Sequence, residues 1–112
     1  MIINKTNNKI IANTVYLADT PFKRMKGLLG RRDLKALEAM VIKPCNSIHT
    51  FFMRFPIDIL FINKGGKVVK CVANMPPFRL SPLSLSSRFV VELPAGTIQA
   101  TNTKEGDQIA VD

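Results

Sequence analysis

The side chains best suited to chemistry lie in an apolar stretch between Cys45 and Ile62. This stretch contains His49, the only histidine of the chain, and Asp58, one of eight acidic residues. An unpaired polar group among bulky apolar neighbours costs several kcal/mol, so both side chains need partners. In an extended segment His49, Phe51 and Met53 share one face. This face predicts the apolar wall of a ligand-binding site.

A second carboxylate, Glu92, lies in another apolar segment. Two close carboxylates can share a proton, so Asp58 and Glu92 together would suit a hydrolase. A buried carboxylate more often accepts hydrogen bonds from backbone amides or an arginine, and Arg24 and Arg31 are available. We expect Asp58 to pair with an arginine of the 24–31 segment. All four residues are candidate polar anchors of a binding site.

The two cysteines, Cys45 and Cys71, are too few for a disulfide framework and fit a reducing compartment. Four residues apart in an extended segment, Cys45 and His49 would lie roughly 12 Å apart, too far for a nucleophile and its base. A metal site would require the fold to bring both cysteines together with His49 and Asp58. We expect reduced thiols, no metal and no cofactor, and favour a binding module over an enzyme.

The net charge of +8 is concentrated in one region of the sequence. Between residues 23 and 35 the only acidic side chain is Asp33. Such a basic patch attracts phosphate backbones in a salt-dependent way, so nucleic-acid binding is an alternative function. No aromatic side chains for base stacking alternate with these charges, which favours an ordinary solvated face. The basic residues are Lys23, Arg24, Lys26, Arg31, Arg32 and Lys35.

With 112 residues the chain has the usual size of one domain. The apolar run from Phe51 to Ile62 is broken by charges and proline and is shorter than the roughly 18 residues of a membrane helix. The N-terminal residues lack the apolar centre of a secretory signal. We therefore expect a single cytoplasmic domain that does not contact a membrane; the oligomeric state is left open.

Short strands and one helix are predicted to position these residues. Residues 9–18 are rich in β-branched side chains and are expected to pair with residues 1–4. Thr20 and Pro21 predict the start of a short helix that ends at Gly30, and a second turn or helix is expected at 33–38. Strand 40–42 follows, and residues 57–62 and 68–72 form a hairpin around the glycine turn at 64–67. Both faces of 57–62 are apolar, so this strand should be covered on both sides.

The segment from Pro76 to Arg88 is rich in proline and serine and is a candidate lid or binding loop. Strands are expected again at 89–93 and 108–111. The fold class is α+β, a small, mostly antiparallel and partly closed β-barrel of about six or seven strands with one short helix. Small barrels commonly bind ligands at the mouth, which supports a binding module for a small or extended ligand.

Four motifs in this order resemble those of the bacterial and archaeal family called domain of unknown function 192. The motifs lie at 23–31, 49–61, 92–96 and 106–107, so the resemblance covers nearly the whole chain. The sequence differs from the common pattern in carrying Phe52 and Leu29 where tryptophan and methionine are usual. The resemblance implies a small barrel-like protein and brings no established activity.

Overall fold

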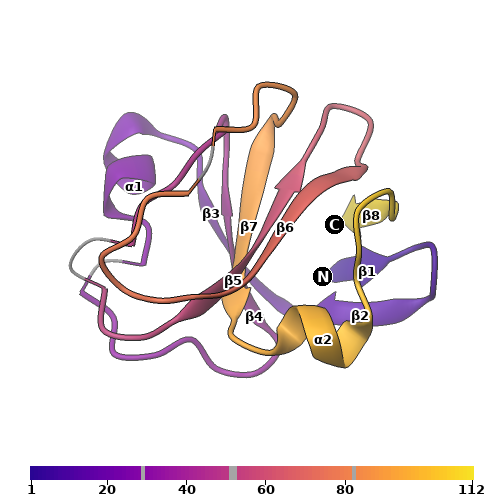
Figure 1. Ribbon diagram of the computed structural model, residues 1–112, viewed down its shortest axis with the longest axis horizontal. Coiled ribbons are helices and arrows are strands. Elements are labelled where there is room, and N and C mark those ends of the chain that lie inside the picture. Colours follow the sequence, from indigo (N-terminus) through magenta and orange to yellow (C-terminus); the bar gives the residue numbers. More distant parts are fainter. Residues whose placement is uncertain (29, 51–52, 82) are drawn as a thin grey trace.

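Two β-sheets and two short helices form the part of the chain described in the computed structural model, residues 1–28, 30–50, 53–81 and 83–112 (Figure 1). The larger sheet has the strand order β3-β4-β7-β5-β6 and the smaller one β2-β1-β8. The elements are β1 (Ile2–Asn4), β2 (Lys9–Ala12), β3 (Thr14–Ala18), α1 (Pro21–Lys26), β4 (Glu38–Ile42), β5 (Ile57–Ile62), β6 (Val68–Met75), β7 (Phe89–Pro94), α2 (Thr97–Thr101) and β8 (Ile109–Val111).

The five-stranded sheet is the central layer of the molecule. One of its faces packs with α1 and the segment before β5, and the other with the small sheet and α2 (Figure 1). Each face carries its own apolar cluster, the first including Ile59 and Phe61 and the second Leu60 and Ile62. Every residue of β5 is therefore buried. The sequence prediction of a strand covered on both sides is confirmed.

Local sequence determines where α1 begins and ends. The Thr20 hydroxyl accepts a hydrogen bond from the Lys23 amide at 3.2 Å, and Pro21 occupies the first helical position. The helix stops at Gly27, whose φ of +47° suits a residue without a Cβ. In this way α1 connects β3 and β4, which pair in parallel. The other strand pairings are antiparallel.

A buried polar cluster fixes the C-terminal motif at 106–107. The Asp107 carboxylate accepts hydrogen bonds from the Asn4 side chain at 2.8 Å and the Lys104 amide at 3.0 Å. Asn4 also contacts Thr103, whose hydroxyl lies 2.7 Å from that of Thr101. These bonds join β1 to the end of α2, so the cluster has a structural role.

Several sequence predictions are confirmed and others are wrong. The 57–62 hairpin and the pairing of residues 1–4 with residues 9–12 are both present. Residues 9–18 are two strands in different sheets, because the chain changes layer at Asn13. Residues 33–38 contain a turn, in which the Glu38 amide donates to the Lys35 carbonyl at 3.0 Å, and no helix; α2 was not predicted. The sheets stack as layers and do not close into a barrel among the described residues, which contain eight strands.

Both helices of the described chain are short, with 6 residues in α1 and 5 in α2. Neither approaches the length and apolar character needed to cross a bilayer.

Candidate functional site

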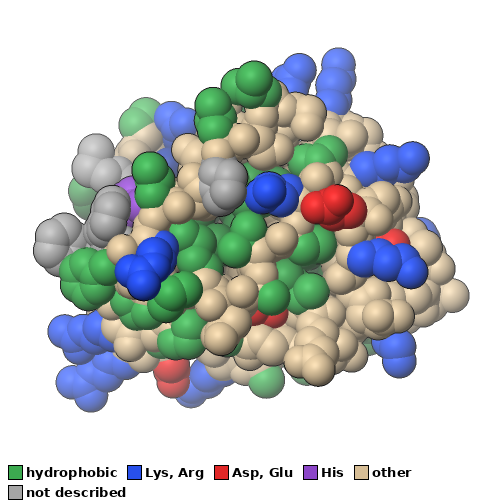
Figure 2. Space-filling model, in the orientation of Figure 1, with side chains coloured by type: hydrophobic (Ala, Val, Ile, Leu, Met, Phe, Trp, Pro, Cys, Tyr) green, Lys and Arg blue, Asp and Glu red, His purple; other side chains and the backbone are tan. Residues whose placement is uncertain are grey.

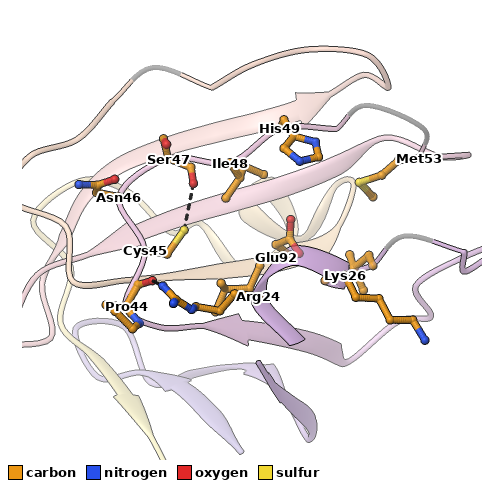
Figure 3. Close-up of a pocket in the computed structure, with 13 residues that line it drawn as sticks. Arg24, Lys26, Pro44, Cys45, Asn46, Ser47, Ile48, His49, Met53 and Glu92 are labelled. Atoms are coloured by element: carbon orange, nitrogen blue, oxygen red, sulfur yellow. Dashed lines mark hydrogen bonds between the residues drawn. The ribbon is translucent and has the colours of Figure 1, made fainter. Parts of the chain in front are cut away.

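A cleft of about 330 Å³ lies between α1, the segment 44–49 and strand β7 (Figure 3). Three of the sequence motifs meet here, since α1, the segment around His49 and the start of the 92–96 motif each contribute to the wall. This volume is at the lower end of the range for small-molecule sites. The lining residues are Arg24, Lys26, Gly27, Leu28, Ile42, Pro44, Cys45, Asn46, Ser47, Ile48, His49, Met53 and Glu92.

Glu92 is the most unusual side chain of the cleft. It is 3% exposed, and its Oε1 atom is buried without a hydrogen-bond partner among the described residues. Across the sheet it pairs with Met40 and Ile59, which are both apolar. Burial in these surroundings raises the pKa of the Glu92 carboxyl to about 8. The carboxyl therefore carries a proton at neutral pH and can donate a hydrogen bond.

Gly27 allows the end of α1 to approach this carboxyl. A Cβ atom at position 27 would lie 3.7 Å from Glu92 Oε1 and 3.7 Å from the Ile42 side chain. The space would admit a methyl group, but the positive φ of Gly27 disfavours any other residue. The glycine therefore serves mainly to end the helix beside the cleft.

Arg24 and Lys26 line the cleft from α1, and in Figure 3 the Lys26 side chain points away from Glu92, so its ammonium lies at the rim. One terminal nitrogen of Arg24 donates to the Pro44 carbonyl at 3.2 Å. Its Nε is buried and has no hydrogen-bond partner among the residues described. Lys26 is exposed. The cleft thus combines Arg24 in its wall, Lys26 at its rim, a buried protonated carboxyl, and two buried polar atoms without a hydrogen-bond partner among the described residues.

The opposite wall is the segment from Cys45 to Thr50, which is held in place by the loop 76–88. Backbone hydrogen bonds join the two at Cys45–Arg88, Asn46–Ser84, Ile48–Ser81 and Thr50–Arg79, with lengths of 2.8 to 3.0 Å. The predicted lid or binding loop lies at the edge of the site. Its described residues support the wall of the cleft through these hydrogen bonds and do not line the cleft themselves.

His49 and Met53 both adjoin the cleft, as the sequence predicts. His49 is exposed and belongs to an isolated bridge with Leu80, whereas Met53 is buried and also packs in the apolar cluster beneath α1. The third member of the predicted face, Phe51, lies outside the described residues.

The thiol of Cys45 faces the same space but is a poor nucleophile. Its Sγ donates a hydrogen bond to the Ser47 carbonyl at 3.0 Å (Figure 3). Burial is the main cause that raises the pKa of this thiol, and burial likewise raises the pKa of Cys71 to about 11. Both cysteines are free, and they pack against clusters on opposite faces of the central sheet.

The prediction that Asp58 pairs with an arginine is wrong. Its Oδ1 accepts from the Asn74 amide at 2.7 Å, and its Oδ2 accepts from the amides of Gly96 and Ile98 at 3.1 and 2.8 Å. Asp58 therefore satisfies backbone donors at the start of α2, where Gly96 has no side chain to do so. It does not line the cleft, and the partners described for it are all backbone amides.

Asp58 and Glu92 also face opposite sides of the central sheet. Asp58 alternates with Ile57 and Ile59 along β5, whereas Glu92 lies directly opposite Ile59 on β7. Because side chains opposite each other share a face, Glu92 lies with Ile59 and Asp58 does not. The two carboxylates cannot share a proton, and the predicted hydrolase pair is not formed.

The basic patch is divided between different roles. Arg31 forms an ion pair with Glu38 at 3.5 Å and lies over the Tyr16 ring at 4.9 Å, away from the cleft. Lys23, Arg32 and Lys35 are exposed. In Figure 2 the Lys and Arg side chains are spread around the visible face and do not form one block. Sequence reasoning had counted Arg31 among the anchors of the site, and the structure does not place it there.

Gly27, Cys45, Asn46 and Ser47 were not predicted as site residues. Gly27 was recognisable as the glycine of the 23–31 motif and marks the end of α1. Nothing in the sequence indicated that the 44–47 turn would face α1, because this proximity depends on how the layers pack.

The arrangement is that of a small α+β protein with a solvent-accessible cleft beside its central sheet. Comparison with known proteins identifies the family to which it belongs. The family model for domain of unknown function 192, described as an uncharacterised ACR, matches residues 2–111, and the chain belongs to this family.

Relatives and solved structures agree with this assignment. A "UPF0127 protein" of Thermococcus sibiricus (strain DSM 12597 / MM 739) is 32% identical over 97% of this chain and 73% of its own length. A protein of unknown function from Novosphingobium aromaticivorans DSM 12444 has a similar crystal structure, with a TM-score of 0.86, 23% identity, and coverage of 98% of this chain and 82% of the other. A crystal structure of "a putative transcription regulator" from Sinorhizobium meliloti 1021 has a TM-score of 0.80, 23% identity, and coverage of 97% and 88%. At these identities the two structures show the fold alone.

Proposed function

We propose that the protein binds a small ligand in the cleft beside Glu92 and does not catalyse a reaction on it. The observation that carries this proposal is a carboxyl group that is 3% exposed, lines a cleft and leaves Oε1 without a partner among the described residues. Leaving a buried polar group unsatisfied costs about 1–3 kcal/mol. An apolar side chain at position 92 would avoid this cost, so a ligand that uses the group would explain its presence.

The remaining lining residues suit such a role. Leu28, Ile48 and Met53 provide an apolar wall, and His49 lies exposed beside it. Specificity in small-molecule sites comes from a few placed polar groups around an apolar surface. Here Arg24 and Glu92 are those groups, and we keep Phe51 as a predicted neighbour of the same wall.

Catalysis is less well supported than binding. The Cys45 thiol is hydrogen-bonded and held neutral by burial, so it lacks the thiolate that a nucleophile needs. Among the described residues that line the cleft, Glu92 is the only carboxylate. The described residues of the cleft therefore contain neither a nucleophile activated by an adjacent base nor a pair of carboxylates.

Nucleic-acid binding through the basic residues is less well supported than small-ligand binding, because part of the patch already has partners within the protein. Two of the six patch residues, Arg24 and Arg31, are committed to the Pro44 carbonyl and to Glu38. The exposed lysines would give long-range, salt-screened attraction.

The test is an amide-detected NMR screen of the 12.5 kDa protein against a panel of small acids, amides, amines and sugars. We expect at least one compound to shift amide signals of residues 44–49 and 24–28 selectively. His49→Ala should weaken that compound at least tenfold while the protein remains folded. Lys26→Ala should weaken an anionic compound, whereas Lys35→Ala, an exposed lysine outside the cleft, should not.

Two results would contradict the proposal. One is a screen in which no class of compound perturbs the cleft. The other is single-stranded DNA that binds tightly at low salt, shifts signals of 23–35 but not 44–49, and loses affinity steeply as salt is added.

A further inference from the structure

We propose that the cleft recognises a small carboxylate, which accepts a hydrogen bond from the Glu92 carboxyl and is attracted by Arg24 and Lys26. This inference rests on the proposed function, because it names the chemical class of the ligand for the same site. It is carried by the geometry of the cleft, where a buried acid with an unused oxygen lies in one wall, Arg24 lines another, and the exposed Lys26 lies at the rim (Figure 3).

The charges around Glu92 favour an anionic ligand over a cationic one. The titratable groups that line the cleft are Arg24 and Lys26 from α1, and Cys45 and His49 from the opposite segment. The strands on either side of Glu92 contribute Met40 and Ile59, which are uncharged. Apart from Glu92, none of the described residues that line the cleft is acidic. A cationic ligand would meet the Arg24 charge in a partly apolar space and that of Lys26 at the rim, whereas an anion is attracted.

The protonation of Glu92 determines how an anion can bind next to it. With its pKa raised to about 8 by burial, the carboxyl is neutral at pH 7 and can donate a hydrogen bond. A bond from a carboxylic acid to a carboxylate is charge-assisted and among the stronger hydrogen bonds in proteins. Once Glu92 loses its proton, the same position presents a negative charge that repels the ligand.

The apolar part of the cleft indicates what the carboxylate is attached to. Leu28, Ile42, Ile48 and Met53 line the space beside the polar groups. A volume of about 330 Å³ is small for a binding site. The cleft therefore suits a monocarboxylate with a short aliphatic chain or a single ring.

The test compares ligands that share a skeleton and differ in charge. Butanoate and benzoate are titrated against the protein by NMR, with butanamide, benzamide, butylamine and benzylamine as matched probes. We expect the two carboxylates to bind at least tenfold more tightly than their amides and amines at about pH 7. Their affinity should fall about tenfold between about pH 7 and about pH 9, because Glu92 ionises in that interval.

Variants assign these effects to individual residues. Glu92→Gln keeps a hydrogen-bond donor without a titrating proton, so carboxylates should still bind and the tenfold fall with pH should disappear. Arg24→Gln and Lys26→Gln should each weaken butanoate several-fold. Lys26 is exposed, so its variant remains informative if Arg24→Gln does not fold. Arg32→Gln, an exposed arginine outside the cleft, should leave the affinity unchanged.

The outcomes separate this inference from the proposed function. If amines or amides bind the cleft and carboxylates do not, the carboxylate assignment is wrong and ligand binding stands. Carboxylates that bind equally at about pH 7 and about pH 9 would also overturn it. If no compound of any class binds, the proposed function itself fails.

Discussion

Replacing Glu92 by Gln should make the protein more resistant to unfolding at neutral and alkaline pH. The carboxyl has a pKa of about 8 in the folded protein, against 4.5 for an ordinary glutamate. As the pH rises from 4.5 the unfolded chain releases this proton, whereas the folded chain retains it up to about pH 8. The unfolded state is therefore stabilised relative to the folded state throughout this interval. Glutamine has no such proton and avoids the penalty.

The size of the effect follows from the two pKa values. Each pH unit between them costs the folded state about 1.4 kcal/mol. Between about pH 5 and about pH 8 the native protein should lose about 3 to 4 kcal/mol of unfolding free energy through Glu92 alone. This is a large fraction of the roughly 5–15 kcal/mol that stabilises a typical domain.

Urea unfolding of the native protein and of Glu92→Gln across this pH range measures the effect. Other titrating groups cancel in the difference between the two proteins, so the advantage of the variant should grow by about 3 to 4 kcal/mol from about pH 5 to about pH 8. Glu105→Gln, which changes an exposed glutamate, is the matched control and should run parallel to the native protein. If the Glu92→Gln profile is also parallel, Glu92 titrates normally and the account of the cleft is wrong.

Three further predictions concern Asp58 and the cysteines. Asp58→Ala should lower the free energy of unfolding by about 3 kcal/mol or more, because three backbone amides lose a buried acceptor; a loss under about 1 kcal/mol in urea would refute this role. Cys45 and Cys71 should react with a thiol reagent far more slowly in the folded protein than in urea, since burial raises both pKa values. Equal rates in the two states would be inconsistent with that explanation. Dialysed protein should contain no stoichiometric zinc, and its presence would contradict the assignment of two structural thiols.

Local signals in the sequence predicted individual elements well. Thr20 and Pro21 marked the start of α1, and the glycine turn before β6 marked the hairpin, because each acts within a few residues. The break at Asn13 was missed because Lys9 to Ala18 is uniformly strand-like. Which sheet each half joins depends on distant partners, Ile2 for Ala12 and Glu38 for Thr14. The same non-local strand pairing determines that the two sheets stack as layers and do not close into a barrel among the described residues.

The site was predicted only in part for the same reason. Four candidates were chosen because they are polar side chains, or a methionine, within apolar motifs. They line one cleft: Arg24, His49, Met53 and Glu92. Asp58, like Glu92, is a carboxylate within an apolar strand, but it faces the other side of the sheet. Which side each carboxylate faces depends on strand register. The choice between amide and arginine partners for Asp58 depended on α2, which the sequence did not reveal.

The measurement that tests the central claim most directly is a ¹³C NMR titration of the Glu92 carboxyl, with and without butanoate. The account predicts a pKa of about 8 in the free protein, and a further rise when butanoate occupies the cleft and uses the proton. A carboxyl that titrates near 4.5, or one whose titration is unchanged by saturating butanoate, would contradict it.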